Sequence, residues 1–152
     1  MDRPAASAAL NAERLTAFLT RQFPQIGLGR NFTIEAAGER GARLRLHFHP
    51  DHLRPGGTIS GPTIFALADV ALYVAILAAI GEVELAVTTN LTINFLRKAG
   101  PGDLIGEARL LKLGKRLAVG EVAMFSIGAA DMVAHATGTY SIPPRGDKIA
   151  VS

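Results

Sequence analysis

The sequence contains no cysteine, which excludes a disulfide framework and a zinc site built on thiolates. This absence fits a reducing compartment, and we expect a cytoplasmic protein. Charged residues are also scarce, at 19% of the 152 residues, whereas hydrophobic residues reach 49%. So apolar a chain can bury enough surface to offset its conformational entropy, which excludes intrinsic disorder. The length predicts a single domain over residues 1–152.

The chain also lacks any run of basic residues. Its 16 Lys and Arg exceed its 13 Asp and Glu by only three charges, so we expect no nucleic-acid partner. The N-terminus lacks the apolar core of a signal peptide. The most apolar stretch, residues 64–80, is shorter than the roughly 20 residues that span a bilayer, and Asp69 lies inside it. We therefore expect no membrane partner.

Two helices are predicted from the spacing of apolar residues. Residues 8–23 have amphipathic spacing that ends before a proline. Residues 61–80 form the second helix, for which Ser60 is a suitable N-cap and Gly81 a suitable stop. This second helix is apolar on every side, so we expect protein to surround it.

Six strands are predicted from apolar stretches bounded by turn signals. They cover residues 32–37, 42–49, 85–97, 103–113, 117–127 and 132–142. The C-terminal tail, about residues 144–152, is expected to be loose. A single sheet can bury a fully apolar helix only by curling around it. The pattern therefore predicts an α+β fold, in which a curved antiparallel β-sheet wraps around one long central helix.

The strand predicted over residues 85–97 alternates with a period of two. Its odd-numbered residues from Leu85 to Phe95 form one face, and its even-numbered residues from Ala86 to Asn94 form the other. We expect one face to pack on the central helix. The other face would meet solvent or a second subunit.

Asp69 is the first candidate for chemistry. It is the only charged residue between Arg54 and Glu82, and it lies too far inside the apolar helix to cap it. A buried carboxylate without a partner is costly, and isolated ionisable groups concentrate at functional sites. We interpret Asp69 as a general base or nucleophile that faces a pocket. The alternative is a carboxylate at the helix edge that reaches solvent or caps a loop.

The start of the same helix is the second candidate. Free backbone N–H groups and the positive end of the helix dipole meet at Ser60-Gly61-Pro62. Such a group suits an oxyanion hole, and Gly61 would let a substrate approach the backbone closely. The alternative is an ordinary capped helix start.

A third feature is the stretch His47-Phe48-His49-Pro50-Asp51-His52. Its H-x-H-x-D-H spacing resembles the zinc motif of the metallo-β-lactamase superfamily, which would imply a metal-dependent hydrolase. Only His135 lies downstream, and it falls within a predicted strand rather than a metal-binding loop. We therefore favour histidines on the polar face of a strand and expect no metal site.

Basic residues flank two of the predicted turns. Arg97 and Lys98 end one strand, and Lys112, Lys115 and Arg116 surround a hairpin at Gly114. These cations either protect strand edges and aid solubility or bind the phosphates of a bulky ligand. Their spacing alone does not decide between the two.

From Leu53 to Tyr140 the sequence resembles the hotdog-fold thioesterases of the PaaI (phenylacetate-degradation) type. The resemblance is carried by RPGGTISGPTIFALADVALYVAI, TTNLTINFLRKAGPGDLIGEARLLKLGKRLAVGEVAM and MVAHATGTYSI. Family members hydrolyse acyl-CoA thioesters without a metal, at a site between two subunits. The resemblance therefore implies an acyl-CoA thioesterase that needs no cofactor besides the CoA of its substrate. It also implies a homodimer, which we expect to pair into a dimer of dimers, a homotetramer.

The resemblance assigns roles to individual positions. Asp69 matches the catalytic acid on the central helix, and Gly61 matches the glycine whose N–H holds the oxyanion. Thr88 lies where members often have a hydroxyl that helps to place water. The resemblance also places the hairpin with Lys115 and Arg116 in a region that often touches CoA phosphates. We expect substrate-binding roles for Arg54, Gly57, Ser60, Pro62, Phe65, Lys115 and Arg116.

The chain departs from the family pattern at three of these positions. Ser60 replaces a histidine, Pro62 replaces a second glycine, and Arg54 replaces an asparagine that helps to polarise the carbonyl. Arg54 is expected to hydrogen-bond a carbonyl, to pair with a carboxylate on the acyl group, or to pair with Asp69 across the interface. The main alternative to a thioesterase is therefore a non-catalytic module that binds acyl-CoA or an acyl carrier.

Overall fold

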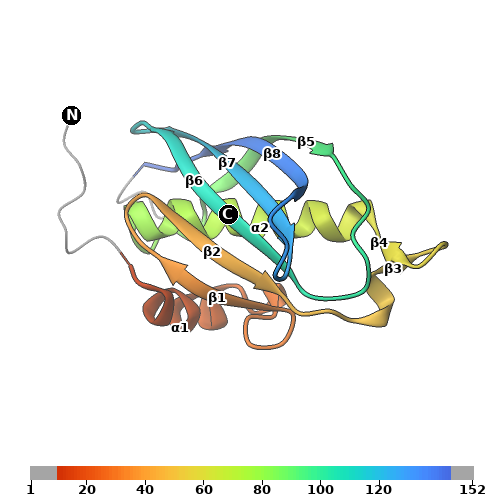
Figure 1. Ribbon diagram of the computed structural model, residues 1–152. Coiled ribbons are helices and arrows are strands. Elements are labelled where there is room, and N and C mark those ends of the chain that lie inside the picture. Colours follow the sequence, from red (N-terminus) through yellow and green to blue (C-terminus); the bar gives the residue numbers. More distant parts are fainter. Residues whose placement is uncertain (1–9, 145–152) are drawn as a thin grey trace, which may run out of the picture.

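The helix α2 (Gly61–Ile80) runs through the centre of the computed structural model, which describes residues 10–144. Its bounds match the predicted helix over residues 61–80. Ser60 caps it by accepting a hydrogen bond from the Thr63 N–H, and Gly81 follows its last residue. A six-stranded sheet lies against α2 (Figure 1).

The sheet is antiparallel throughout, in the order β1-β2-β6-β7-β8-β5. Its strands are β1 (Phe32–Ala37), β2 (Gly41–Leu46), β5 (Val87–Phe95), β6 (Leu104–Leu113), β7 (Leu117–Ser126) and β8 (Met132–Ser141). The sheet and the central helix confirm the predicted α+β hotdog fold. Most strands end one to three residues short of the predicted bounds. The residues at those ends continue the alternating pattern of a strand but form no ladder hydrogen bonds.

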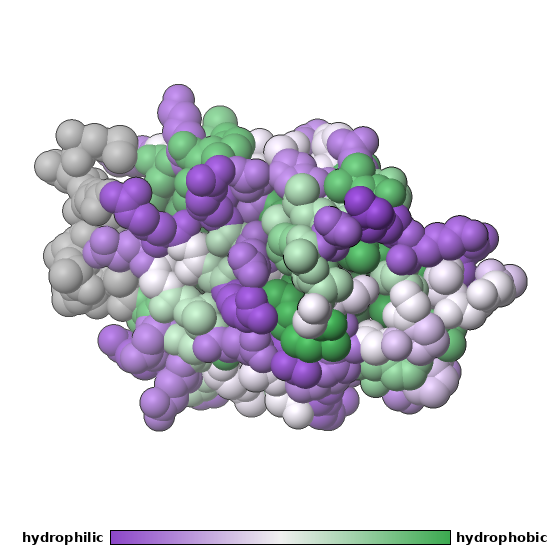
Figure 2. Space-filling model, in the orientation of Figure 1, coloured by the Kyte–Doolittle hydropathy of each residue, from purple (hydrophilic) through white to green (hydrophobic). Residues whose placement is uncertain are grey.

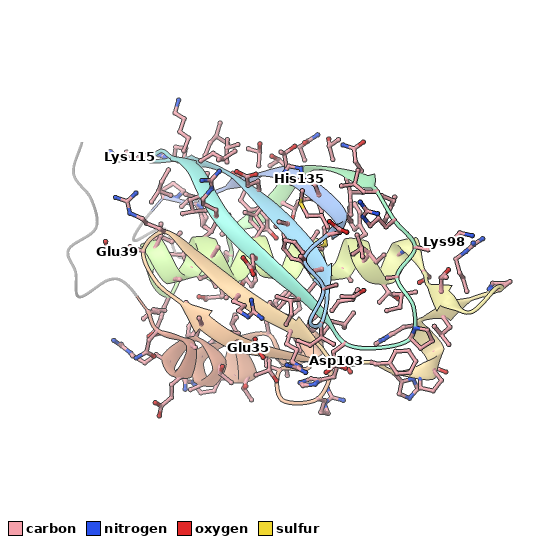
Figure 3. All side chains as sticks on the ribbon, in the orientation of Figure 1. Glu35, Glu39, Lys98, Asp103, Lys115 and His135 are labelled. Atoms are coloured by element: carbon pink, nitrogen blue, oxygen red, sulfur yellow. The ribbon has the colours of Figure 1, made fainter. Side chains whose placement is uncertain are left out.

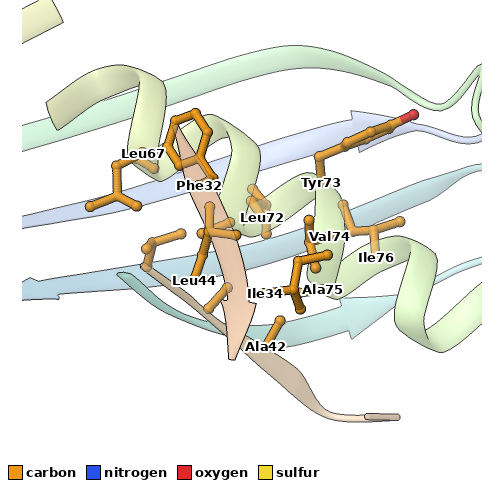
Figure 4. Packing of buried hydrophobic residues seen from close by; sticks show 14 of the residues in the cluster. Phe32, Ile34, Ala42, Leu44, Leu67, Leu72, Tyr73, Val74, Ala75 and Ile76 are labelled. Carbon is orange, nitrogen blue, oxygen red and sulfur yellow. The ribbon is translucent and has the colours of Figure 1, made fainter. Parts of the chain in front are cut away.

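The core lies between α2 and the inner face of the sheet. Figure 4 shows Leu67, Leu72 and Ile76 of α2 close to Ile34 and Leu44 of the first two strands. Glycine permits the closest approach of helix and sheet, since a Cβ on Gly120 would lie 2.5 Å from a Leu72 methyl carbon. The small residues of β7 and β8 therefore let the sheet bend tightly around α2.

Smaller elements close the two ends of the core. The helix α1 (Ala12–Gln22), predicted over residues 8–23, buries Leu15, Phe18 and Leu19, and residues 8–9 lie outside the described part. A 3₁₀ turn η2 (Pro24–Ile26) follows it. A second turn, η3 (Pro50–His52), leads into the two-stranded ribbon β3 (Leu53–Arg54) and β4 (Thr58–Ile59), just before α2. The tail predicted to be loose lies outside the described residues, apart from Pro144.

The strict alternation predicted for residues 85–97 is wrong at one point. A β-bulge between Thr88 and Asn90 inserts an extra residue, Thr89, opposite β8. The bulge changes which residues face inwards, so that Thr88, Leu91 and Ile93 are partly buried and Val87 is 57% exposed. A bulge of this kind re-aims side chains without breaking the strand.

Within a single chain, the expectation that protein surrounds α2 on every side holds only for its second half. From residue 71 onwards every residue of α2 is buried. Before that point a stripe remains open, with Pro62, Phe65 and Ala66 exposed and Asp69 partly buried. Residues four apart share one helix face, so these residues form a single strip along the first half of α2. The apolar composition of α2 could not distinguish burial by its own chain from burial by a second one.

Ion pairs connect the strands on the face of the sheet away from α2. Arg43 of β2 contacts Glu35 of β1 and Glu107 of β6, each at 2.8 Å. Farther along, Glu121 of β7 lies 2.9 Å from His135 of β8. Figure 3 labels Glu35 and His135, and Figure 2 shows hydrophilic residues mixed with smaller hydrophobic patches over this side. This outer face is therefore largely polar.

The helix α2 is also long and apolar enough to cross a membrane, but 72% of its most apolar window is buried inside the protein. Those buried residues pack against the sheet, as the core helix of a folded domain does. Its apolar composition is accounted for by this packing.

Candidate active site

Asp69 is held by two hydroxyl groups from neighbouring strands. The Thr88 hydroxyl of β5 donates to Asp69 Oδ1 at 2.7 Å, and the Tyr140 hydroxyl of β8 donates to the same oxygen at 2.6 Å. Tyr140 also lies 3.1 Å from the backbone oxygen of Asp69. The structure therefore brings together Asp69 and Thr88, two of the residues for which the sequence analysis predicted catalytic roles.

The second carboxylate oxygen, Oδ2, is free. It accepts no hydrogen bond and forms no ion pair with any residue of the described segment. No side-chain oxygen or nitrogen of that segment is both buried and unpartnered, so Oδ2 reaches solvent. One oxygen of Asp69 is thus fixed by the protein and the other is open, which is the arrangement of a carboxylate that can receive a proton or attack a carbon.

The sequence analysis missed Tyr140. It is 3% exposed, and its ring stacks on Tyr73 of α2 with the ring centres 5.9 Å apart. Burial, and then the nearby charge of Asp69, raises the pKa of the Tyr140 hydroxyl above its usual range, so the group remains a donor at neutral pH. A signal did exist: Tyr140 ends an alternating run of small inward residues, and a buried tyrosine hydroxyl needs a partner.

One free amide remains at the start of α2. Pro62 has no N–H, the Thr63 N–H donates to Ser60 Oγ at 3.4 Å, and the Ile64 N–H donates to the Ser60 carbonyl at 3.1 Å. Within residues 10–144 the Gly61 N–H has no hydrogen-bond partner. The capping by Ser60 and the ring of Pro62 thus leave Gly61 as the one available donor of this turn.

Asp69 and Gly61 are eight residues apart on the same stripe of α2. At the rise of an α-helix this spacing is about 12 Å along the axis. Reacting atoms must approach to about 3–3.5 Å. Within one chain the two groups are therefore too far apart for a single carbonyl group of a substrate to contact both Gly61 and Asp69.

The remaining predicted substrate-binding residues lie near the start of α2 or at the opposite end of the sheet. Phe65 is 40% exposed on the open stripe, one turn after Gly61. Arg54 and Gly57 belong to the β3–β4 ribbon, where Gly57 has a φ of +80° in the turn. Arg54 is exposed and has no ion-pair partner in the described part, so an Arg54–Asp69 pair does not form within the chain.

Lys115 and Arg116 lie in the hairpin between β6 and β7. In Figure 3 Lys115 lies at the opposite end of the molecule from Lys98 and the β3–β4 ribbon. The hairpin does lie near the end of β8, since the Ile142 N–H donates to the Arg116 carbonyl at 2.8 Å. Within one chain these cations therefore approach the Tyr140 end of the sheet and not the start of α2.

The H-x-H-x-D-H stretch has a local structural role. His49 Nδ1 accepts a hydrogen bond from the Asp51 N–H, and His52 Nδ1 accepts one from the His49 N–H, which together cap η3. His47 instead bonds the Thr33 hydroxyl through Nε2. Among residues 10–144 no three His, Asp or Glu side chains are placed to hold a metal ion. The geometry gives the zinc alternative no support.

Comparisons with known proteins agree with this fold. The model of the Thioesterase superfamily matches residues 56–131. A solved structure of a proposed thioesterase from Silicibacter sp. TM1040 is 48% identical, covers 91% of this chain and 96% of its own, and superposes with a TM-score of 0.81. A mutant of the phenylacetic acid degradation protein PaaI from Thermus thermophilus is 26% identical, over 74% of this chain and 94% of its own, with a TM-score of 0.65.

A curated relative gives the same indication. A proposed esterase from Saccharolobus solfataricus is 32% identical over 101 residues, which is 66% of each chain. These similarities support a hydrolase of the thioester type.

Proposed function

Because the chain belongs to the thioesterase superfamily, we propose that it hydrolyses acyl-CoA thioesters at a site shared by two subunits. One observation carries the proposal: the first half of α2, which stays open along one stripe, holds both a carboxylate with a free oxygen and the free Gly61 amide. A general base for the attacking water and a donor for the oxyanion are the two groups that support acyl transfer to water without a metal.

The chemistry begins with a water molecule bound to Asp69 Oδ2. This oxygen takes a proton as the water attacks the acyl carbon, and the carbonyl oxygen becomes an oxyanion that the Gly61 N–H of the other subunit stabilises. Collapse of the intermediate breaks the C–S bond, and the proton passes to the CoA thiolate. Direct attack by Oδ2 would instead form an acyl-enzyme anhydride, and hydrolysis in ¹⁸O-labelled water under single-turnover conditions separates the two routes.

The substrate-binding roles follow from position. Phe65 lies between Gly61 and Asp69 on the stripe, so it would line the acyl group. Arg54 is available for a carbonyl or carboxylate of the substrate, and Gly57 and Ser60 shape the entrance beside it. Lys115 and Arg116 would contact the CoA phosphates, because exposed cations bind phosphate oxygens.

A homodimer supplies the second half of the site. Within the described residues, β5 is an edge strand paired only with β8, and its Val87 and Phe95 side chains are 57% and 53% exposed. An edge strand presents unpaired backbone N–H and C=O groups, which favour pairing with another strand. We propose that two copies pair along β5, that two such dimers form a tetramer, and that the enzyme works in the cytoplasm.

A thiol-release assay over short, aromatic and long acyl-CoAs tests the proposal. We expect turnover of at least one class by the wild-type protein, and loss of turnover in a folded Asp69→Asn variant. Wild-type rates in Asp69→Asn would refute the assignment of the acid. CoA-ester binding without thiol release would instead indicate the binding module.

A further inference from the structure

Asp69 Oδ1 receives two hydrogen bonds, and only the one from Thr88 involves a residue that the resemblance assigned. The Tyr140 hydroxyl donates the other, at 2.6 Å, and it is the shorter of the two. Tyr140 is 3% exposed at the end of an inner strand, where its ring packs in the core. Its hydroxyl, however, donates to the carboxylate on which the proposed chemistry depends.

The hydroxyl of Tyr140 is fixed from several directions. Its ring stacks on Tyr73, and its backbone pairs with Thr88 on one side and Ala118 on the other. The hydroxyl oxygen also lies 3.1 Å from the backbone carbonyl oxygen of Asp69, so it contacts both the side chain and the backbone of that residue. A donor held by two strands and a ring stack keeps its position better than the hydroxyl of an exposed side chain.

From this geometry we propose that Tyr140 is a positioning residue, which together with Thr88 holds Asp69 Oδ1 and thereby points Oδ2 into the active site. The proposal rests on the proposed thioesterase function. The two donors converge on one oxygen and leave the other open to solvent. A carboxylate that could rotate freely would offer either oxygen, in many directions, and would lose the alignment that efficient attack requires.

Tyr73 supplies a matched control. It is also buried, at 5% exposed, it belongs to the same ring stack, and its hydroxyl donates to the Glu84 carbonyl at 2.8 Å. Tyr73→Phe therefore removes a comparable buried hydroxyl without touching Asp69. A purely structural role for Tyr140 predicts the same behaviour for both variants.

The test compares kcat and KM of Tyr140→Phe and Tyr73→Phe in thiol release. We expect kcat to fall about 10–100-fold in Tyr140→Phe with KM changed less than about twofold, and both constants to stay near wild type in Tyr73→Phe. Equal kcat values for the two variants would overturn the proposal, and loss of activity in Asp69→Asn would at the same time leave the proposed function in place. If Asp69→Asn is fully active, both fall.

A second measurement does not depend on turnover. A double-mutant cycle with Asp69→Ala and Tyr140→Phe on the free energy of unfolding reports the contact between the two side chains. We expect a coupling that the corresponding cycle with Tyr73→Phe lacks. Additive effects in both cycles would show that the Tyr140 hydroxyl does not hold Asp69.

Discussion

Thr88 and Tyr140 stand directly opposite each other on β5 and β8, and their hydroxyls donate to the same oxygen of Asp69. The bulge that follows Thr88 lets this residue face inwards on the same side as Leu91 and Ile93 farther along β5. A local irregularity in a neighbouring strand thus helps to set the surroundings of Asp69.

Thr88→Val should lower kcat by about tenfold, which corresponds to about 1.4 kcal/mol of transition-state stabilisation. The change keeps the branched shape of the side chain and removes the donor to Asp69 Oδ1. Thr88→Ser keeps the donor and should retain most of the activity. Steady-state kinetics on one acyl-CoA would measure both, and similar losses in the two variants would point to packing in place of hydrogen bonding.

Gly61→Val should abolish turnover while the protein still folds. A Cβ at Gly61 would lie 3.4 Å from the Phe95 ring, at the close end of ordinary contact, so the first carbon of a new side chain fits beside Phe95. The larger side chain would instead block the approach of a carbonyl to the Gly61 N–H. Gly61→Ala is the graded control, with an intermediate loss. Unchanged kcat in Gly61→Val, with a native circular dichroism spectrum, would place the oxyanion elsewhere.

A variant with lysines at both ends of the β5 edge should be monomeric and inactive. When two antiparallel copies pair along this edge, Val87 near the start of one strand lies towards Phe95 at the end of the other. Val87→Lys with Phe95→Lys therefore brings like charges together. Analytical ultracentrifugation measures the mass, and Leu111→Lys, at a similarly exposed position on β6, is the control. A double variant that sediments as the wild type does would exclude pairing along β5.

Asp103→Asn should destabilise the fold by about 1–2 kcal/mol at pH 7. The Phe48 N–H, at 2.7 Å from Oδ1, and the Arg45 guanidinium lower the pKa of Asp103 below its usual 3.8. Because the folded pKa is the lower one, the stabilisation is complete above about pH 5 and is lost as the pH falls through the unfolded and then the folded value. Urea unfolding at several pH values should therefore show the wild type and Asp103→Asn converging below pH 4.

An exposed carboxylate provides the control for this experiment. Asp131 is 76% exposed and lies 3.9 Å from Arg97, an arrangement that contributes little to stability. Asp131→Asn should unfold like the wild type at every pH. A constant difference between Asp103→Asn and the wild type down to pH 2 would contradict the role of its charge.

The sequence predicted the fold because its signals are local and strong. Ser60, Gly81 and an unbroken apolar run define α2, and alternation between turns defines the strands. The sequence also identified Asp69 as a candidate, since a single carboxylate within an apolar helix can be recognised from the sequence alone. These inferences need only the periods of the helix and the strand and the cost of burying a charge.

The sequence could not show which groups meet Asp69, because contacts across a sheet depend on register. The bulge after Thr88 shifts the inward face of β5, and nothing in the composition of that strand marks it. Tyr140 lies 71 residues from Asp69 in the chain, and only the β5–β8 pairing beside α2 brings their side chains together.

The sequence by itself thus determined a buried helix, an enclosing sheet and one isolated acid, because each follows from the burial preferences of neighbouring residues. Only the tertiary structure decided that the stripe before residue 71 stays open and that one oxygen of Asp69 is fixed and the other free. Those features depend on strand register and on the path of the chain around α2, which are set by packing between distant segments.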